Sequence, residues 1–194
     1  MSFMSDGPLD LRMDPDRGEP AWLEIRAADV ATLTRVLREH GDVPGALRLA
    51  RAMSAAAAEG KLTTTRELVQ LVERTAAGRP HPRRLAQVFQ ALRIWVNHEA
   101  EDLEAALAWL PGAVRAGGVV VTIAYHSGED RRVKQTLRGE RPIVSRRRPA
   151  LEAPAPLAVW ESLHRGVIAP SEEEVARNVR ARSARLRAFR RTGT

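Results

Sequence analysis

Apolar side chains recur every three or four positions through most of the first hundred residues, which is the spacing of amphipathic helices. Val30, Leu33 and Val36 fall on one face of such a helix, and Gly41 follows as its end. The segments with this spacing are residues 30–40, 44–53, 64–78, 81–96 and 103–110. The pattern predicts a helical body, preceded by an extended or looping segment over residues 1–19, where Pro8 and Pro15 forbid a long helix.

One of these helices has a clear start signal. Thr64 and Glu67 have the spacing of a capping box, in which each side chain binds a free backbone N–H of the first turn. The helix is therefore expected to begin directly after Thr64.

The period of the pattern changes after the Gly117-Gly118 pair. Residues 119–124 read VVVTIA, a mostly β-branched run that is typical of a strand buried on both faces. A helix is expected over residues 129–137, a short one after Ser171, and a last strand over residues 184–189, while residues 139–160 are predicted to form a loop. A helix, a glycine turn and a buried strand in this order indicate α/β structure in the second half.

His126 and Ser127 come directly after the predicted strand. In open α/β sheets, ligands sit outside the carboxyl ends of the strands, so both residues are placed where a substrate would bind. The structural alternative is that Ser127 or Asp130 only caps the helix that follows.

Charge is distributed unevenly along the 194 residues. Residues 1–130 carry 15 basic and 18 acidic side chains, whereas residues 131–194 carry 16 basic and 6 acidic ones. The second segment therefore has a net charge of +10, which points to a polyanion and most simply to RNA. Only Lys61 and Lys134 are lysines. GC-rich coding could explain the preference for arginine, but it does not explain the asymmetry.

The composition excludes several classes of site. The chain has no cysteine, which rules out disulfides, thiolate metal sites and cysteine nucleophiles and suits a reducing cytoplasm. The five histidines show no metal-ligand spacing, and there is neither a Walker loop nor a Gly-x-Gly-x-x-Gly motif. No apolar run approaches the ~20 residues needed to cross a bilayer, so no membrane partner is expected.

Four short motifs carry a family resemblance. Residues 7–14 read GPLDLRMD, residues 89–97 FQALRIWVN, residues 125–131 YHSGEDR and residues 178–187 NVRARSARLR. In this order they resemble the bacterial 16S ribosomal RNA cytosine-N4 methyltransferases of the RsmH (MraW) type, which read DGPLDMRMD, FQALRIxVN, FHSLEDR and NPRARSAKLR. Gly128 stands where the family has leucine, and Val179 where it has proline.

The resemblance implies a fold. In that family a helical domain is inserted into a Rossmann-like class I methyltransferase domain. We therefore expect an α/β fold with a helical insertion, in which an all-α domain is joined to the C-terminal part of the methyltransferase sheet. The expected division is an inter-domain loop over residues 1–19, the helical insertion over 20–98, and the sheet part with a basic tail over 99–194. The family's first half, with its glycine-rich donor loop, would precede residue 1, so a truncated or mis-called start is expected.

The resemblance also implies the chemistry. These enzymes transfer a methyl group from S-adenosyl-L-methionine to N4 of a cytidine in 16S rRNA. Their donor contacts lie in the first half, so no cofactor-binding residue is expected here. The amine lone pair is delocalised into the cytosine ring, so an oxygen acceptor must polarise its N–H bonds. Asp10 is a candidate for that acceptor, and His126 and Ser127 are the other expected catalytic residues. The alternative for Asp10 is a structural ion pair with an arginine of its own loop.

The expected RNA-binding residues are mostly arginines, whose forks match phosphate oxygens. The full set is Arg12, Arg93, Asn97, Arg131, Arg180, Arg182, Arg185 and Arg187. On a strand, alternation would put Arg180 and Arg182 on one face and Arg185 and Arg187 on the other. The alternatives are a solvated polar stripe at Arg93 and Asn97 and a disordered basic tail beyond residue 188. The expected partner is 16S rRNA or the small ribosomal subunit, with a homodimer as a further expectation.

Two other function classes stay open on the sequence. A non-catalytic RNA- or ribosome-binding helical module with a basic arm would explain the missing donor loop and the basic last third. A DNA-binding helix-turn-helix protein has weaker support, from the run Thr63-Thr64-Thr65 before an amphipathic helix. The DNA directly upstream distinguishes the module from the enzyme, because an in-frame glycine-rich loop would restore the donor site.

Overall fold

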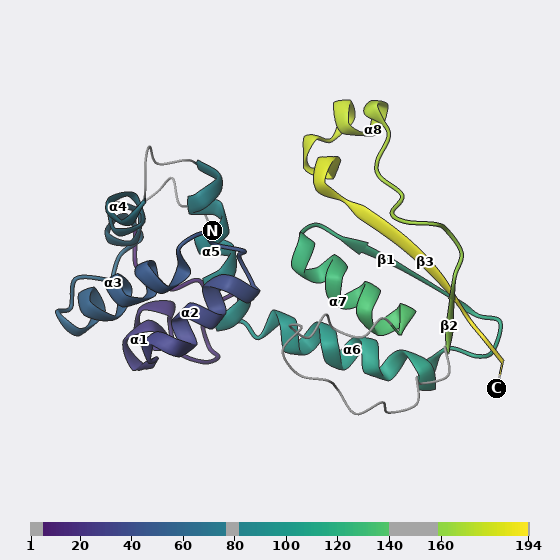
Figure 1. Cartoon of the computed structure of the whole chain (residues 1–194), viewed down its shortest axis with the longest axis horizontal. Helices are drawn as coiled ribbons and strands as arrows, with labels where there is room; N and C mark the ends of the chain where they lie inside the picture. The colour runs from purple at the N-terminus through teal and green to yellow at the C-terminus, as the bar shows by residue number, and fades with distance from the viewer. Residues whose placement is uncertain (1–5, 77–81, 140–158, 194) are drawn as a thin grey trace. The chain divides into compact units, whose positions relative to one another are not determined.

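The computed structural model of the chain describes residues 6–76, 82–139 and 159–193. The chain forms two compact units, Met1–Ala100 and Glu101–Thr194. The first unit is helical, and the second combines helices with a small antiparallel sheet (Figure 1). The chain therefore contains both helices and strands, as the change of period at residues 117–118 predicted.

Five helices build the first unit. They are α1 (Ala21–Ala27), α2 (Val30–Glu39), α3 (Ala46–Ala58), α4 (Thr65–Thr75) and α5 (Pro82–Val96). Helices α2 to α5 match segments whose apolar spacing predicted a helix. Helix α1 was not expected, because its seven residues make too few turns to show a periodic signal.

The apolar stripes of these helices meet in one core. Leu33 and Leu37 of α2, Leu49 and Met53 of α3, and Leu92 of α5 are fully buried. They belong to a single cluster that also includes buried residues of α1 and α4. Because burying one such side chain contributes roughly 1.5–3 kcal/mol, this core holds the helical unit together.

The loop before α1 belongs to the same core. Leu9 is fully buried, and its N–H donates to the Thr63 carbonyl oxygen at 2.8 Å, while its own carbonyl oxygen accepts from the Trp22 N–H at 3.0 Å. Pro8 and Thr64 form an isolated antiparallel bridge. The start of the first motif is therefore extended and is fixed beside the starts of α1 and α4.

Side chains set the helix starts in this unit. The Thr64 hydroxyl accepts from the Glu67 N–H at 3.2 Å, and the Glu67 carboxylate accepts from the Thr64 N–H at 2.9 Å. The predicted capping box of α4 is therefore confirmed. Asp29 caps α2 by accepting from the Thr32 N–H at 2.7 Å.

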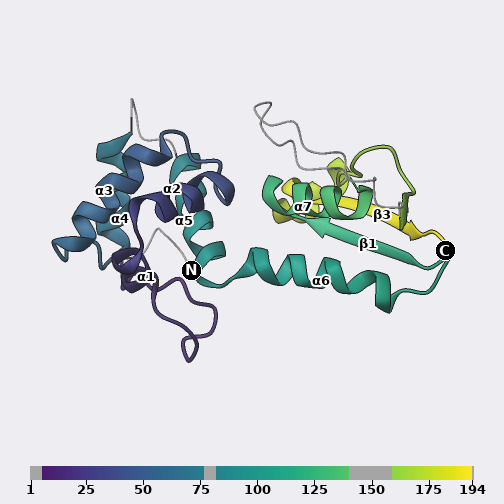
Figure 2. The ribbon, with the colours of Figure 1, turned by 60° about the horizontal axis from the view of Figure 1, so that its bottom comes forward.

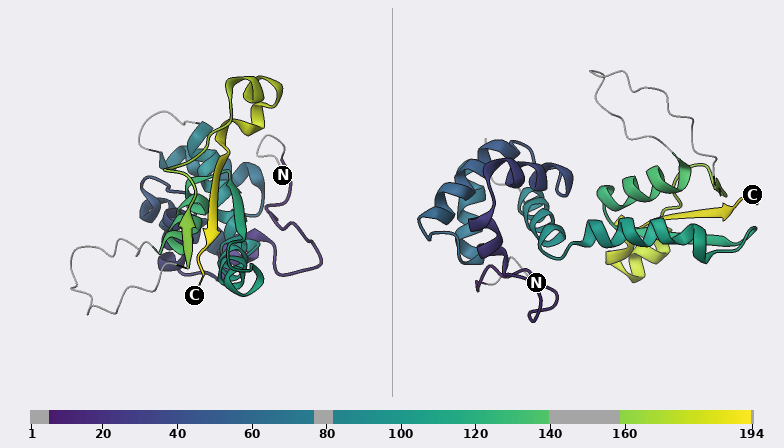
Figure 3. Two further views of the ribbon diagram at one scale, coloured as in Figure 1. Left: turned by 90° about the vertical axis from the view of Figure 1, so that its right-hand side faces the viewer. Right: turned by 90° about the horizontal axis from the view of Figure 1, so that it is seen from below.

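The second unit is built around three strands. Its elements are α6 (Glu99–Ala113), β1 (Val119–Ala124), α7 (Ser127–Arg138), β2 (Trp160–Ser162), α8 (Glu172–Arg177), the 3₁₀ helix η1 (Val179–Ser183) and β3 (Arg185–Arg191). The strand order is β1-β3-β2 with both pairings antiparallel, so β3 lies in the middle (Figure 3, left). Helix α7 lies along the sheet (Figure 2).

The expectation that the first strand is buried on both faces was wrong. Val119, Val121 and Ile123 of β1 are 50%, 56% and 58% exposed. Val120, which points the other way, packs against the buried cluster of Leu107, Val133, Leu137, Trp160 and Phe189, supplied by α6, α7 and the other strands. A β-branched run therefore indicates strand propensity and does not tell how many faces the structure covers.

The C-terminal region agrees with the prediction in part. The last strand and the helix after Ser171 are confirmed, and the Ser171 hydroxyl accepts from the Glu174 N–H at 3.1 Å. Arg180 and Arg182 lie on η1 and not on a strand, so the predicted alternation of all four arginines along one strand was wrong. Strand β2 was not expected. The predicted loop over residues 139–160 falls mostly outside the described residues.

Candidate functional site

The loop that carries the first motif is tied to the end of α5, which carries the second. The Asn97 amide nitrogen donates to the Leu11 carbonyl oxygen at 2.8 Å, and the Asn97 amide oxygen accepts from the Met13 N–H at 2.7 Å. These contacts join residues 86 and 84 positions apart. Two motifs that are distant in the sequence therefore form one structural site in the first unit.

Within this loop, Asp10 and Arg12 form a two-pronged ion pair. Arg12 Nε and Nη2 lie 2.7 and 2.9 Å from the two Asp10 carboxylate oxygens, and Arg12 Nη1 donates to the Gly18 carbonyl oxygen at 2.9 Å. The hydrogen bonds from Arg12 hold the pKa of Asp10 below its ordinary value. This geometry is the structural ion pair that the sequence left as the alternative, and catalysis by Asp10 stays a prediction.

Arg93 is engaged at the same end of α5. Its Nε and Nη2 lie 2.7 and 2.9 Å from the Glu99 carboxylate oxygens, and its carbonyl oxygen accepts from the Asn97 amide nitrogen at 2.8 Å. His98, which lies between Asn97 and Glu99 in the sequence, has a φ of 54° and follows the end of α5. Arg93 and Asn97 thus both contact groups within the unit, and RNA binding by either one stays a prediction.

His126 and Ser127 stand at the start of α7, as the motif predicted. The helix is capped by His126, whose Nδ1 accepts from the Glu129 N–H at 3.3 Å, while Glu129 Oε2 accepts from the Tyr125 N–H at 2.9 Å. Burial alone would raise the pKa of Glu129, but hydrogen bonds from His126 and the Tyr125 N–H outweigh it and leave that pKa lowered. The cap that the sequence assigned to Ser127 or Asp130 therefore belongs to His126.

Asp130 forms a buried ion pair with Arg187 in the second unit. Arg187 Nε and Nη2 of β3 lie 2.7 and 3.1 Å from its two oxygens, and Arg185 Nη1 lies 3.4 Å away. Asp130 and Arg187 are each 7% exposed. The hydrogen bond from Arg187 lowers the pKa of Asp130 against the opposing effect of burial.

Arg187 is thus engaged within the unit, and phosphate binding by it stays a prediction. Its guanidinium group contacts Asp130 of α7 and the Gly166 carbonyl oxygen, and the residue pairs across the sheet with Thr122. Arg185 differs, since 46% of its side chain is exposed.

Two further predicted arginines lie on the surface of η1. Arg180 and Arg182 are exposed on either side of Ala181, which is buried. The Asn178 side chain accepts from the Arg180 N–H at 3.1 Å and so starts this turn. Arg131 of α7 is exposed as well.

The structure thus separates the predicted residues into two groups. Asp10, Arg12, Arg93 and Asn97 come together in the first unit, and the remaining ones lie in the second. The sequence did not single out Glu99, Glu129 or Asp130 as partners of these residues. The acidic pair at positions 129 and 130 lies in the first turn of the helix after the strand, and this was the available signal for a helix cap and an arginine partner.

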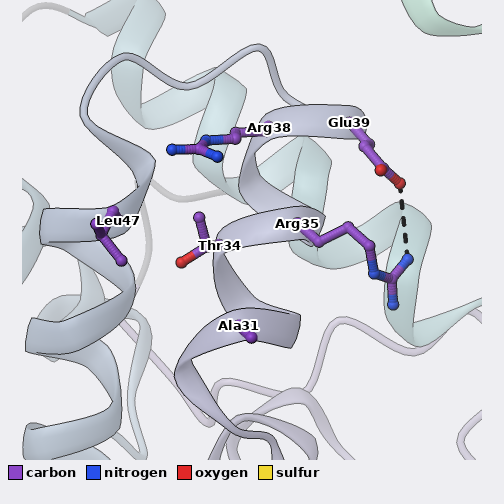
Figure 4. Close-up of a pocket in the computed structure, with 6 residues that line it drawn as sticks. All are labelled: Ala31, Thr34, Arg35, Arg38, Glu39 and Leu47. Carbon is purple, nitrogen blue, oxygen red and sulfur yellow. Dashed lines mark ion pairs between the residues drawn. The ribbon is translucent and has the colours of Figure 1, made fainter. Parts of the chain in front are cut away.

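One hollow, of about 480 Å³, adjoins the first motif and is lined by Asp6, Gly7, Pro8, Trp22, Thr63 and Thr64. A shallow hollow of about 410 Å³ between α2 and α3 is bordered by the Arg35–Glu39 ion pair and contains none of the motif residues (Figure 4). In residues 6–76, 82–139 and 159–193 there is no cluster of three or more acidic or histidine side chains that could hold a metal ion. Over the same residues, no helix combines the length and the apolar character that a membrane crossing requires.

The sequence of the chain matches a family of methylases. The family model of the MraW methylase family matches residues 1–192, and the chain belongs to that family. It is 40% identical to the ribosomal RNA small subunit methyltransferase H of Aromatoleum aromaticum over its whole length and 62% of the relative. It is 42% identical to the protein of the same name from Burkholderia cenocepacia, over 96% of this chain and 61% of the relative. The chain thus spans about three fifths of these relatives.

A methylase family implies the use of S-adenosylmethionine, and the Gly117-Gly118 turn and the Gly7 loop do not fit this donor. A Cβ at Gly118 would meet Val114 at 2.7 Å, and the Gly117 N–H donates to the Arg191 carbonyl oxygen at 2.9 Å. The Gly117-Gly118 turn therefore packs against other residues of its own chain. In the first motif, the Gly7 N–H donates to the Asp6 side chain. The backbone donors of both turns are thus used within the chain.

Proposed function

We propose that this chain takes part in the S-adenosylmethionine-dependent N4-methylation of a cytidine in 16S rRNA. Its second unit would form the C-terminal part of a Rossmann-like methyltransferase sheet. The observation that carries the proposal is the family match over residues 1–192, together with the packing of two family motifs against each other through Asn97. The small ribosomal subunit is the proposed partner and the cytoplasm the proposed location.

The proposed catalytic groups come from both units. Methylation of the cytosine amine needs an acceptor for its N–H bonds, and the loop around Asp10 supplies carboxylates on a backbone fixed by Asn97. His126 and Ser127 follow β1, and Ser127 is exposed. In this proposal the loop around Asp10 contacts the target base, and His126 and Ser127 are proposed separately as polar groups of the second unit. No methyl-donor step is assigned to these residues.

RNA contact is proposed for the exposed arginines of the second unit. Arg180 and Arg182 lie on the surface of η1, and Arg185 is half exposed. Guanidinium groups in such places contact phosphates without large desolvation cost. Arg12 and Arg93 are held in internal ion pairs with 17% and 35% of their side chains exposed, so their proposed contribution is smaller.

The salt dependence of RNA binding tests this assignment. Each neutralised phosphate adds roughly 0.7–0.9 to the slope of log affinity against log salt concentration. The double variant Arg180→Ala/Arg182→Ala should flatten the slope by about 1.5 for this reason, and His126→Asn should leave it nearly unchanged. A titration of a labelled RNA oligonucleotide at several salt concentrations measures it. An unchanged slope in the double variant would remove these arginines from the RNA surface.

A non-catalytic RNA- or ribosome-binding module is the second candidate. The observation that favours it is that the Gly117-Gly118 turn and the Gly7 loop use their donors within the chain. Calorimetry with S-adenosylmethionine separates the candidates at the level of this chain, and we expect weak or no binding. Micromolar binding would show that the chain holds a donor site of its own.

Sedimentation of the same sample tests the proposed homodimer.

A further inference from the structure

The first motif contains a residue in a backbone conformation that its side chain disfavours. Leu11 has a φ of 64°, in the left-handed region, although it is not glycine. Its side chain is also buried, with 9% exposed. Such a conformation is unfavourable for a residue of this type and persists only where the surroundings impose it.

Asn97 supplies the constraint. Its amide group contacts the backbone on both sides of Arg12, at the Leu11 carbonyl oxygen and the Met13 N–H, while its amide nitrogen also donates to the Arg93 carbonyl oxygen. Only a side chain with a donor and an acceptor on one planar group can make this set of contacts. Asn97 thus fixes the loop to the last turn of α5.

The fixed turn decides which groups of the loop face outwards. Asp10 and Arg12 neutralise each other, and the Arg12 side chain is only 17% exposed. Met13 is 63% exposed, although it is apolar, and 54% of the Asp14 side chain is exposed. The only ion pair described for Asp14 is with Arg17 at 3.5 Å, and that arginine is itself 87% exposed. Such an exposed pair contributes little. Asp14 Oδ1 also accepts from the Asp16 N–H at 3.1 Å, and the carboxylate keeps further acceptor sites for a ligand.

We propose that Asn97 is a positioning residue that holds the left-handed turn at Leu11 and so presents Met13 and Asp14 to the target base. Met13 then contacts the face of the base, for which its flexible, polarisable thioether is suited. The Asp14 carboxylate accepts a hydrogen bond from the cytosine amine, a pairing that carboxylates make with N4 of cytosine. This inference rests on the proposed function, because it names the residues that select cytidine.

Two matched RNA oligonucleotides provide the binding test, one with a single cytidine and one with uridine at the same place. Uridine carries a carbonyl oxygen where cytidine has the amine, so a carboxylate contact discriminates between them. The chain should prefer the cytidine RNA by about tenfold. Asp14→Asn and Asn97→Ala should abolish the preference, whereas Asp16→Asn, which changes an exposed carboxylate of the same loop, should retain it. A preference that survives in Asp14→Asn, or that is lost equally in Asp16→Asn, would overturn the proposal.

Gln90→Ala is the matched control for Asn97→Ala. Gln90 lies on the same helix and also donates to a backbone carbonyl oxygen, that of His40 at 3.0 Å, but it does not touch the loop. Both variants lose one amide side chain, and only Asn97→Ala should change the ratio of the two affinities. If the ratio of the two RNA affinities is the same in both variants, Asn97 has only a structural role, and the proposal is contradicted. Asp14→Asn and Met13→Ala change exposed residues and keep the test decisive if Asn97→Ala does not fold.

Hydrogen exchange at the Met13 amide tests the clamp without RNA. Its N–H donates to Asn97, so its exchange should be about tenfold faster in Asn97→Ala than in the wild type or in Gln90→Ala. If the wild type binds neither RNA, the proposed function and the base contact both fail, while the exchange rates still decide the clamp. Unchanged Met13 exchange in Asn97→Ala, with RNA binding intact, would overturn the positioning role alone.

Discussion

The two units of the chain use the same apolar residue types, but their apolar faces are covered to different extents. In the helical unit, the stripes of α2 to α5 and Leu9 of the preceding loop all face one core. In the sheet unit, one face of β1 packs on the buried cluster, and the other leaves Val119, Val121 and Ile123 about half exposed. The difference teaches that local pattern determines which elements form, while neighbouring elements determine which of their faces are covered.

The units also contain two Asp–Arg pairs of similar geometry in different surroundings. The Asp10–Arg12 pair joins neighbours on one loop and is partly exposed. The Asp130–Arg187 pair joins α7 to β3 across 57 positions and is buried. The first pair shapes a loop, and the second connects a helix to the sheet.

The largest effect is expected from Asp130→Ala. Removing the carboxylate leaves the Arg187 guanidinium buried without its main partner, and such losses cost about 3–5 kcal/mol. Urea unfolding followed at the amides of β3 measures the change. Asp10→Ala is the control, because its partner can turn to solvent, and we expect a much smaller loss. Similar losses for both variants would contradict the distinction between the pairs.

Large-to-small substitutions sharpen the contrast between the cores. Leu33→Ala in α2 should cost about 2–5 kcal/mol because it leaves a cavity in a closed core. Ile123→Ala on the open face of β1 should cost under about 1 kcal/mol, since its side chain is 58% exposed. The denaturant midpoints of the two variants measure these losses of stability. A loss at Ile123 that equals the loss at Leu33 would mean that this face is covered in solution.

Acid should weaken the sheet unit through Asp130. Arg187 holds the pKa of Asp130 below its ordinary value, so the unfolded chain takes up this proton at higher pH than the folded one. The stabilisation is therefore complete above about pH 4 and is lost as the pH falls through the lower folded pKa. Stability measured between about pH 6 and pH 3 should decline less steeply in Asp130→Asn. A parallel decline would assign the acid sensitivity to other groups.

Loss of either capping box should have a smaller effect than loss of the buried ion pair or of a side chain in the closed core. Thr64→Ala and His126→Ala each remove the acceptor for a first-turn N–H, and each should cost about 0.5–2 kcal/mol. His126→Asn should recover most of that stability, because asparagine is a good cap. If methylation by an assembled enzyme stays low in His126→Asn while stability is restored, the imidazole has a role beyond capping. Full recovery of both would leave His126 as a cap only.

Much of the fold could be predicted because its signals are local. The stripe at residues 30–37, the Thr64–Glu67 box and the β-branched run at 119–124 each determine an element from within a few residues. The open face of β1 could not be predicted, because it depends on what packs there. The burial of Arg187 likewise depends on the pairing of β3 with β1 and on the placement of α7.

The candidate site was predictable as a set of motifs but not as a geometry. The motifs pointed to Asp10, Arg12 and Asn97. Nothing in the sequence showed that the Asn97 side chain forms hydrogen bonds with the backbone of the loop. The capping role of His126 was missed because histidine is uncommon at that position and serine or aspartate stood close by.

Native-state hydrogen exchange on the monomeric chain tests the contrast between the units most directly. Amides of α5 around Val88 and Leu92 lie in the closed core, whereas β1 pairs only with β3 among the described strands and has one open face. The account predicts that the α5 amides exchange at least about tenfold more slowly than the β1 amides bonded to β3. Equal protection of the two segments, in a sample shown to be monomeric by sedimentation, would contradict it.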